Sequence, residues 1–300
     1  MKLNTNKAAF GQHETFPMRY GWMTKGVEAL TKSPDFFAKP EEAMIELGIG
    51  SNMVRALQYW LRVTGIARFD QGEGIVTPLG EALIGDKGDQ YLEDEATLWI
   101  IHWLIASNAE LATGFFWFFN HYAIPRFQDK DALQALSEFV ASELKTNRSL
   151  STLKSDISTL LRMYAPVTGK ADEHLDSPLG QLQLVERDEG HSHRSLRSIR
   201  PFLPPIALHF ALQQIFFAQP KLPAIPIRSL LYGGDGWVAP GAVFRLSEEG
   251  LMDALHRVME IYPKHYELRE TAGLHQLYRS SRANDAVSVL HGYYQGGRIQ

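Results

Sequence analysis

The chain has 300 residues, of which 45% are hydrophobic and 21% are charged, a balance typical of globular proteins rather than disordered ones. It contains no cysteine, which excludes disulfides, thiolate nucleophiles and cysteine-based zinc or iron–sulfur sites. The formal net charge of −4 argues against a protein that coats DNA nonspecifically, so any contact with phosphates must come from a local positive patch.

Neither the start of the chain nor its most apolar region predicts a membrane segment. The first ten residues are polar and lack the apolar stretch of a signal peptide. Residues 96–119 are apolar, but they are interrupted by His102, Asn108 and Glu110, so they predict two buried helices rather than a membrane span. We therefore expect a cytoplasmic protein that does not contact a membrane.

The order helix, tight turn, helix, hairpin over residues 40–84 predicts a winged helix-turn-helix. Pro40 and the two glutamates after it are typical of a helix start, and Gly48 of a helix end. The expected elements are helices at 40–47, 51–64 and 81–84 and strands at 66–69 and 75–77.

The rest of the chain is expected to be mainly helical, with small β-hairpins. Helices are predicted at 95–106, 109–121, 129–144, 151–164, 206–218, 247–261 and 271–279, with an irregular segment at 165–205 and a strand at 266–268. We divide the chain into an N-terminal winged helix-turn-helix domain with a helical extension, residues 1–125, and a helical C-terminal domain, residues 126–300.

The predicted helix 51–64 separates polar from apolar side chains. At 100° per residue, its polar stripe contains Ser51, Asn52, Arg55, Gln58, Tyr59 and Arg62. Arginine can pair with guanine, asparagine and glutamine can pair with adenine, and a serine near a helix start can hold a phosphate. The stripe therefore predicts DNA contact, and the alternative is an ordinary solvated face. The acidic turn at 70–74 suits a protein partner or solvent better than phosphate.

The predicted helix 151–164 repeats this layout. Its polar stripe contains Ser151, Thr152, Ser155, Ser158, Thr159 and Arg162. The segment Thr77-Pro78-Leu79-Gly80 also recurs as Ser177-Pro178-Leu179-Gly180. These similarities predict a second winged-helix-like unit with its own contact face, and the segment 266–279 is a weaker candidate for a third. The alternative is that two amphipathic helices match by coincidence.

Three groups of residues are candidates for chemistry. His13 and Glu14 have the side chains of an acid–base pair, but neighbours in an irregular segment rarely point the same way, so a structural role is favoured. His191 and His193 alternate as strand ligands of a metal do, although the arginines after them favour an anion-binding or solvated loop. Residues 172–176 form an acidic cluster that matches no known nuclease signature. We assign no catalytic residue, metal or cofactor.

Several segments, taken in order, resemble the domain-of-unknown-function family 4007 over nearly the whole chain. They are FGQHETFPMRYGW, ELGIGSNMVRALQYWL, TPLGEALIG, LEDEATLWIIHWLIASN, DSPLGQLQL and APGAVFRLSEEGL. The resemblance implies a bacterial gene often found beside DNA phosphorothioate-modification and other phage-defence genes, and it implies no established activity. It also marks His13, Glu14, Arg19 and Tyr20 as a candidate family site.

We therefore expect a DNA-binding accessory or regulatory protein of a phosphorothioate-modification and phage-defence system, without enzymatic activity of its own. Its expected partners are duplex DNA, including phosphorothioate-modified DNA, and a DNA-modification or restriction enzyme. The alternatives are a scaffold that docks such an enzyme and, less favoured, a metal-dependent nuclease that uses the carboxylates of residues 172–176.

Overall fold

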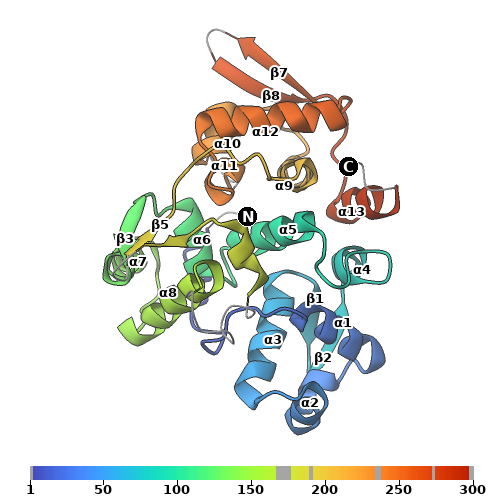
Figure 1. Ribbon diagram of the computed structural model, residues 1–300, viewed down its shortest axis with the longest axis vertical. Coiled ribbons are helices and arrows are strands. Elements are labelled where there is room, and N and C mark those ends of the chain that lie inside the picture. The colour runs from blue at the N-terminus through green and yellow to red at the C-terminus, as the bar shows by residue number, and fades with distance from the viewer. Residues whose placement is uncertain (1–2, 167–176, 189–191, 234–237, 272–273, 297–300) are drawn as a thin grey trace.

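The computed structural model of the chain describes residues 3–166, 177–188, 192–233, 238–271 and 274–296. Within these residues the structure is mainly helical, and its strands form three small antiparallel sheets (Figure 1). This agrees with the predicted class. No helix in the described part of the chain has both the length and the apolar character needed to cross a bilayer.

The first part of the chain has the order of elements that its sequence predicts. It contains α1 (Trp22–Lys32), η1 (Phe36–Ala38), α2 (Pro40–Leu47), α3 (Ser51–Val63), β1 (Ala67–Asp70), β2 (Glu73–Val76) and α4 (Pro78–Ile84). Gly48, with a φ of 64°, ends α2 in the left-handed conformation that favours glycine. Thr77 caps α4, because its Oγ1 accepts a hydrogen bond of 3.0 Å from the Gly80 amide.

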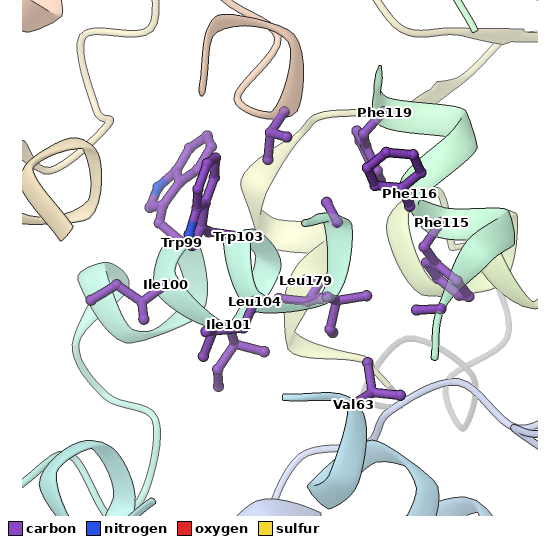
Figure 2. Packing of buried hydrophobic residues seen from close by; sticks show 14 of the residues in the cluster. Val63, Trp99, Ile100, Ile101, Trp103, Leu104, Phe115, Phe116, Phe119 and Leu179 are labelled. Carbon is purple, nitrogen blue, oxygen red and sulfur yellow. The ribbon is translucent and has the colours of Figure 1, made fainter. Parts of the chain in front are cut away.

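Two consecutive apolar helices, α5 (Glu95–Ala106) and α6 (Thr113–Asn120), lie in the core. They carry apolar side chains on every face, which is expected of helices that other elements surround. Figure 2 shows Trp99 and Trp103 of α5 at one side of this core and Phe115 and Phe119 of α6 at the other. The predicted helix at 109–121 starts later than expected, because the Asn108 side chain accepts a hydrogen bond from the Leu111 amide in a turn.

His102 of α5 is held within this core by hydrogen bonds at both ring nitrogens. Nε2 donates to the Val243 carbonyl at 2.9 Å, and Nδ1 accepts from the Tyr164 hydroxyl at 2.7 Å. Burial lowers the pKa of His102 to about 3, so the ring is neutral at pH 7.

The middle and last parts of the chain each contain a three-stranded sheet with the same strand order. The middle part contains β3 (Arg126–Gln128), α7 (Asp129–Glu143), α8 (Leu150–Tyr164), η2 (Pro178–Leu182), β4 (Glu186–Arg187) and β5 (Ser192–Arg194). The last part contains α9 (Pro205–Ala218), β6 (Ala224–Pro226), α10 (Ile227–Tyr232), α11 (Pro240–Val243), α12 (Glu248–Ile261), β7 (Tyr266–Thr271), β8 (Leu274–Arg279) and α13 (Ala286–Gln295). The sheet orders are β3-β5-β4 and β6-β8-β7, so in both sheets the last strand lies in the centre.

The structure corrects three sequence expectations in these parts. The predicted helix at 271–279 is instead β8, which pairs with both β6 and β7 and buries Leu277 completely. The segment 165–205, expected to be irregular, contains η2, β4 and β5. The two Pro-Leu-Gly segments are not equivalent, because Thr77 precedes a helix that follows a hairpin, whereas Ser177 precedes a helix that comes before one.

Arg245 links the last part of the chain to α6 through a buried guanidinium group. Its Nη2 donates to the Phe118 carbonyl at 2.9 Å, and its Nε donates to Ser195 Oγ at 2.9 Å. Longer hydrogen bonds of 3.4 Å reach the carbonyls of Phe119 and Tyr122. Burial, with the nearby charges of two further arginines, lowers the pKa of Arg245 to about 9. The acceptors of these four hydrogen bonds are all carbonyl or hydroxyl oxygens, so the buried cation is bound by uncharged groups.

Candidate nucleic-acid interface

Residues 8–16, hereafter the N-terminal loop, lie between α3 and α8 and contact both helices. From α3, Trp60 Nε1 donates to the Phe16 carbonyl at 3.0 Å. From α8, Asp156 Oδ1 accepts from the Gly11 amide at 3.2 Å. The sequence predicts an irregular segment here, and the structure agrees, since the first helix begins only at Trp22. The loop joins two helices that are far apart in sequence.

His13 is completely buried in the N-terminal loop, and both of its ring nitrogens are engaged. The Thr15 amide donates to Nδ1 at 3.1 Å, so the proton of the neutral ring is on Nε2, which donates to Asp156 Oδ1 at 2.7 Å. The ring stacks on Trp60 and meets the edges of Tyr59 and Phe115. This environment supports the structural interpretation of His13 over the acid–base one.

The ion pair of Glu14 and the side-chain hydrogen bond of His13 lead to different helices. Its Oε1 lies 3.7 Å from Arg55 Nη1 on α3, whereas His13 is bound to Asp156 on α8. Glu14 has a φ of 49° and Thr15 a φ of 66°, both in the left-handed region, and this turn separates the two side chains. The two residues therefore do not form a pair with each other.

Four exposed arginines surround the N-terminal loop, and we name them the arginine rim: Arg55, Arg62, Arg148 and Arg162. Arg55 contacts Glu14, as described, and Arg62 Nη2 donates to Gln12 Oε1 at 2.7 Å. Arg148 donates to the Ala8 carbonyl at 3.0 Å, and Arg162 donates to the Thr15 carbonyl. Because all four contact one short loop, they form a local cluster of positive charge in a chain whose net charge is negative.

The polar stripe of α3 is exposed or half-buried at every position except one. Asn52, Arg55 and Arg62 are exposed, while Ser51 and Gln58 are half-buried. Tyr59 is buried, and its hydroxyl donates to the Leu111 carbonyl at 3.0 Å. Burial, with the nearby Asp156 carboxylate, raises the Tyr59 pKa well above its ordinary value. Tyr59 was placed on the stripe wrongly, because the N-terminal loop and α6 cover that edge of the helix.

The stripe of α8 is also partly covered. Ser151, Ser158 and Arg162 are exposed, Thr152 and Ser155 are half-buried, and Thr159 is buried. The predicted separate contact face is wrong in one respect: both stripes border the same loop and form one surface with it. Sequence reasoning missed Asp156, whose only local signal is a lone carboxylate within a hydroxyl-rich helix.

The remaining residues of the candidate family site, Arg19 and Tyr20, lie on the chain just after the N-terminal loop. Arg19 is half-buried, with its guanidinium 5.9 Å from the Phe16 ring centre and 5.8 Å from the Trp22 ring centre. The Tyr20 hydroxyl accepts a hydrogen bond from Gln181 of η2, and burial raises its pKa. These two residues anchor the chain after the loop rather than extending from the surface.

The candidate metal ligands are not assembled in the described part of the structure. His193 is buried, with Nδ1 3.2 Å from Asp129 Oδ1. His191 and the acidic cluster at 172–176 lie outside the described residues. Among the residues that are described, no three histidine, aspartate or glutamate side chains are placed to hold a metal ion together.

Comparisons with known proteins give one family and two similar structures. A family model described as "Protein of unknown function (DUF4007)" matches residues 10–294. A magnesium ion-bound SspB crystal structure is similar with a TM-score of 0.85 and 24% identity, over 99% of this chain and 90% of that one. An SspB crystal structure has a TM-score of 0.84 and 25% identity, over 99% and 91% of the two chains. No curated protein matches.

Proposed function

Since the chain belongs to the DUF4007 family, whose function is unknown, we propose from the site itself that it binds duplex DNA through the arginine rim and the exposed side chains of α3. The observation that carries the proposal is the convergence of four exposed arginines on the N-terminal loop. Guanidinium groups bind phosphates in a bidentate manner, and Asn52 beside them offers the amide that pairs with adenine. In this proposal, α2, α3 and the β1–β2 hairpin act as a winged helix-turn-helix.

The charge distribution limits how the DNA can approach. The turn between β1 and β2 carries Asp70 and Glu73, so contact by this wing with phosphates would be repulsive. The exposed start of α3 and the arginine rim, with Glu14 as the acidic side chain that pairs with Arg55, are the better surface. We place this binding in DNA phosphorothioate modification and phage defence, the setting that the family resemblance implies, with an accessory or regulatory role.

Replacing Arg55 by alanine is expected to weaken duplex binding by about 5- to 150-fold, the effect of losing one specific arginine contact of about 1–3 kcal/mol. The salt dependence of binding should also fall by about one counterion if the contact is to phosphate. Fluorescence anisotropy with a labelled duplex over a series of salt concentrations measures both quantities. The same series with a phosphorothioate duplex shows whether sulfur is distinguished from oxygen.

Arg269→Ala is the matched control for this experiment. Arg269 is also exposed and paired with a glutamate, at 2.6 Å from Glu267, but it lies on β7 at the opposite end of the long axis from α3 (Figure 1). Neither substitution should change the Tm appreciably, because exposed ion pairs contribute little to stability. Equal binding by both variants and the wild type would contradict the proposed interface and favour the docking of a modification or restriction enzyme there.

Metal-dependent DNA cleavage is a second candidate function, favoured by the magnesium ion in one of the similar structures. The described residues of this chain hold no group of three histidine, aspartate or glutamate ligands, so we assign no residue to the metal. The carboxylates of Asp172 and Asp176 lie outside the described residues.

Incubation of supercoiled plasmid with the purified protein distinguishes the two functions. If the protein only binds DNA, the plasmid remains supercoiled both with Mg²⁺ and with EDTA, and this is the result we expect. Nicking that needs Mg²⁺ and disappears in the Asp172→Asn, Asp176→Asn double variant would establish cleavage instead. Agarose gel electrophoresis separates the nicked and supercoiled forms.

A further inference from the structure

A cavity of about 250 Å³ lies between the start of α9, the end of α12 and α13, away from the N-terminal loop (Figure 1). Its walls include the two proline rings of Pro204 and Pro205 and the aromatic rings of Tyr262 and Tyr293. This volume is just below the range of about 300–1,000 Å³ for sites that hold drug-sized ligands, so the cavity fits a smaller molecule.

A buried chain of hydrogen bonds leads to His209 in the wall of this cavity. The Asn284 amide donates to Gln213 Oε1 at 2.6 Å, which fixes the orientation of the Gln213 side chain. Gln213 Nε2 therefore donates to the Tyr266 hydroxyl at 2.7 Å. The Tyr266 hydroxyl, which accepts this hydrogen bond, donates its own hydrogen to His209 Nδ1 at 2.9 Å. The proton of the neutral His209 ring is consequently on Nε2.

His209 differs from the other deeply buried histidine of the helical core, His102, in what its Nε2 meets. Nε2 of His102 donates to a backbone carbonyl, whereas Nε2 of His209 has no partner among the described residues. The His209 side chain is nearly inaccessible, with 3% exposed, and it contributes to the cavity wall. Its ring lies parallel to Tyr262, with centres 3.8 Å apart, so its orientation is fixed. Nε2 is not among the fully enclosed side-chain atoms that lack a partner, so it borders the cavity, where it can donate a hydrogen bond to a ligand.

The charge of the residues that line the cavity indicates which kind of ligand can accept a hydrogen bond from His209 Nε2. None of the described residues that line the cavity is an aspartate, glutamate, lysine or arginine. Burial, with the nearby His265, lowers the pKa of His209 to about 3, so its ring is also neutral at pH 7. A charged ligand would lose its hydration without gaining a partner of opposite charge, which is costly. The side-chain amide of Asn284, also in the wall, offers one further donor and one acceptor.

We propose that this cavity binds an uncharged planar heterocycle of nucleobase or nucleoside size, which accepts a hydrogen bond from His209 Nε2. Flat aromatic and proline surfaces contact the faces of such a ring, while the fixed histidine and Asn284 bind the donors and acceptors on its edge. A free nucleoside and a base of a DNA strand share this chemistry. The site is separate from the arginine rim, so it does not depend on the proposed function.

The test uses Gly292 of α13, which lines the cavity and faces open space, since a Cβ added there meets no atom within 4 Å. We expect a leucine side chain at this position of the wall to obstruct the cavity, and Gly292 takes no part in the hydrogen bonds of His209. Gly292→Ala is the matched control, because it adds one methyl group and should raise helix stability by up to about 1 kcal/mol. The Tm of each variant verifies that it is folded.

Calorimetric titration with adenosine, guanosine, cytidine and thymidine forms one arm, and titration with a short single-stranded oligonucleotide forms the other. We expect saturable binding in at least one arm, weakened about tenfold or more by Gly292→Leu and little by Gly292→Ala. The nitrogen-15 signal of His209 Nε2 should shift on binding. Binding by the oligonucleotide alone, lost in Gly292→Leu, identifies the source as a DNA base. No binding in either arm, or equal binding by Gly292→Leu, overturns the proposal.

Discussion

Replacing Arg245 by methionine is expected to lower the free energy of unfolding by at least about 1–3 kcal/mol, because it leaves buried acceptors without a hydrogen-bond partner. Methionine retains much of the side-chain length, so the loss comes mainly from the hydrogen bonds. The carbonyls of Phe118, Phe119 and Tyr122 and the Ser195 hydroxyl all accept from the guanidinium. Each buried polar group left without a partner costs about 1–3 kcal/mol.

Urea denaturation followed by circular dichroism measures this change, and Arg228→Met is the matched control. Arg228 lies on α10 and is exposed, so its replacement should change stability by less than about 0.5 kcal/mol. A comparably small effect of Arg245→Met would contradict the role that we assign to this buried cation.

Stability is expected to fall steeply as the pH is lowered from 6.5, because His102 and His209 are buried in the neutral state. Their pKa values in the folded protein are about 3, below the value near 6.5 of an unfolded chain. The unfolded state therefore binds more protons in this window. The stability that these histidines confer is fully present above pH 6.5 and is lost progressively between pH 6.5 and pH 3. The expected slope is up to about 1.4 kcal/mol per pH unit for each histidine.

Urea denaturation at pH 7, 6 and 5 measures this slope before most carboxylates begin to titrate. In His102→Phe the absolute stability falls at every pH, but the slope between pH 6.5 and pH 5 should be smaller than that of the wild type by up to about 1.4 kcal/mol per pH unit, the contribution of one histidine. A slope that His102→Phe leaves unchanged would mean that His102 is not the titrating group.

The sequence predicts the helices well and the last sheet poorly. The difference follows from how far apart in the sequence the residues lie that determine a helix or a sheet. The bounds of α2 and α5 agree with the predicted ones, since caps and periodicity act within a few residues. The segment 271–279 was assigned wrongly as a helix, and only part of the pairing of β8, that with β7, is local. β8 lies between β7 and β6, and β6 is about fifty residues earlier in the chain.

The candidate site was predictable in part for the same reason. The helical wheel places Leu57 and Trp60 on the buried side of α3, and both are completely buried. It cannot show which other segment covers the edges of a helix, and so it placed Tyr59 and Thr159 on exposed stripes. The bond between His13 and Asp156 spans 143 residues, and no pattern within either segment indicates it.

The same separation has a consequence for how the chain matures during synthesis. The N-terminal loop is synthesised before its partner Asp156, which is added 143 residues after His13. At about 5–20 residues per second, this interval is about 7–30 s. During this interval His13 lacks its partner, the carboxylate of Asp156, and Phe10 and Phe16 lack part of their packing. The N-terminal loop therefore completes its folding only after α8 has been made.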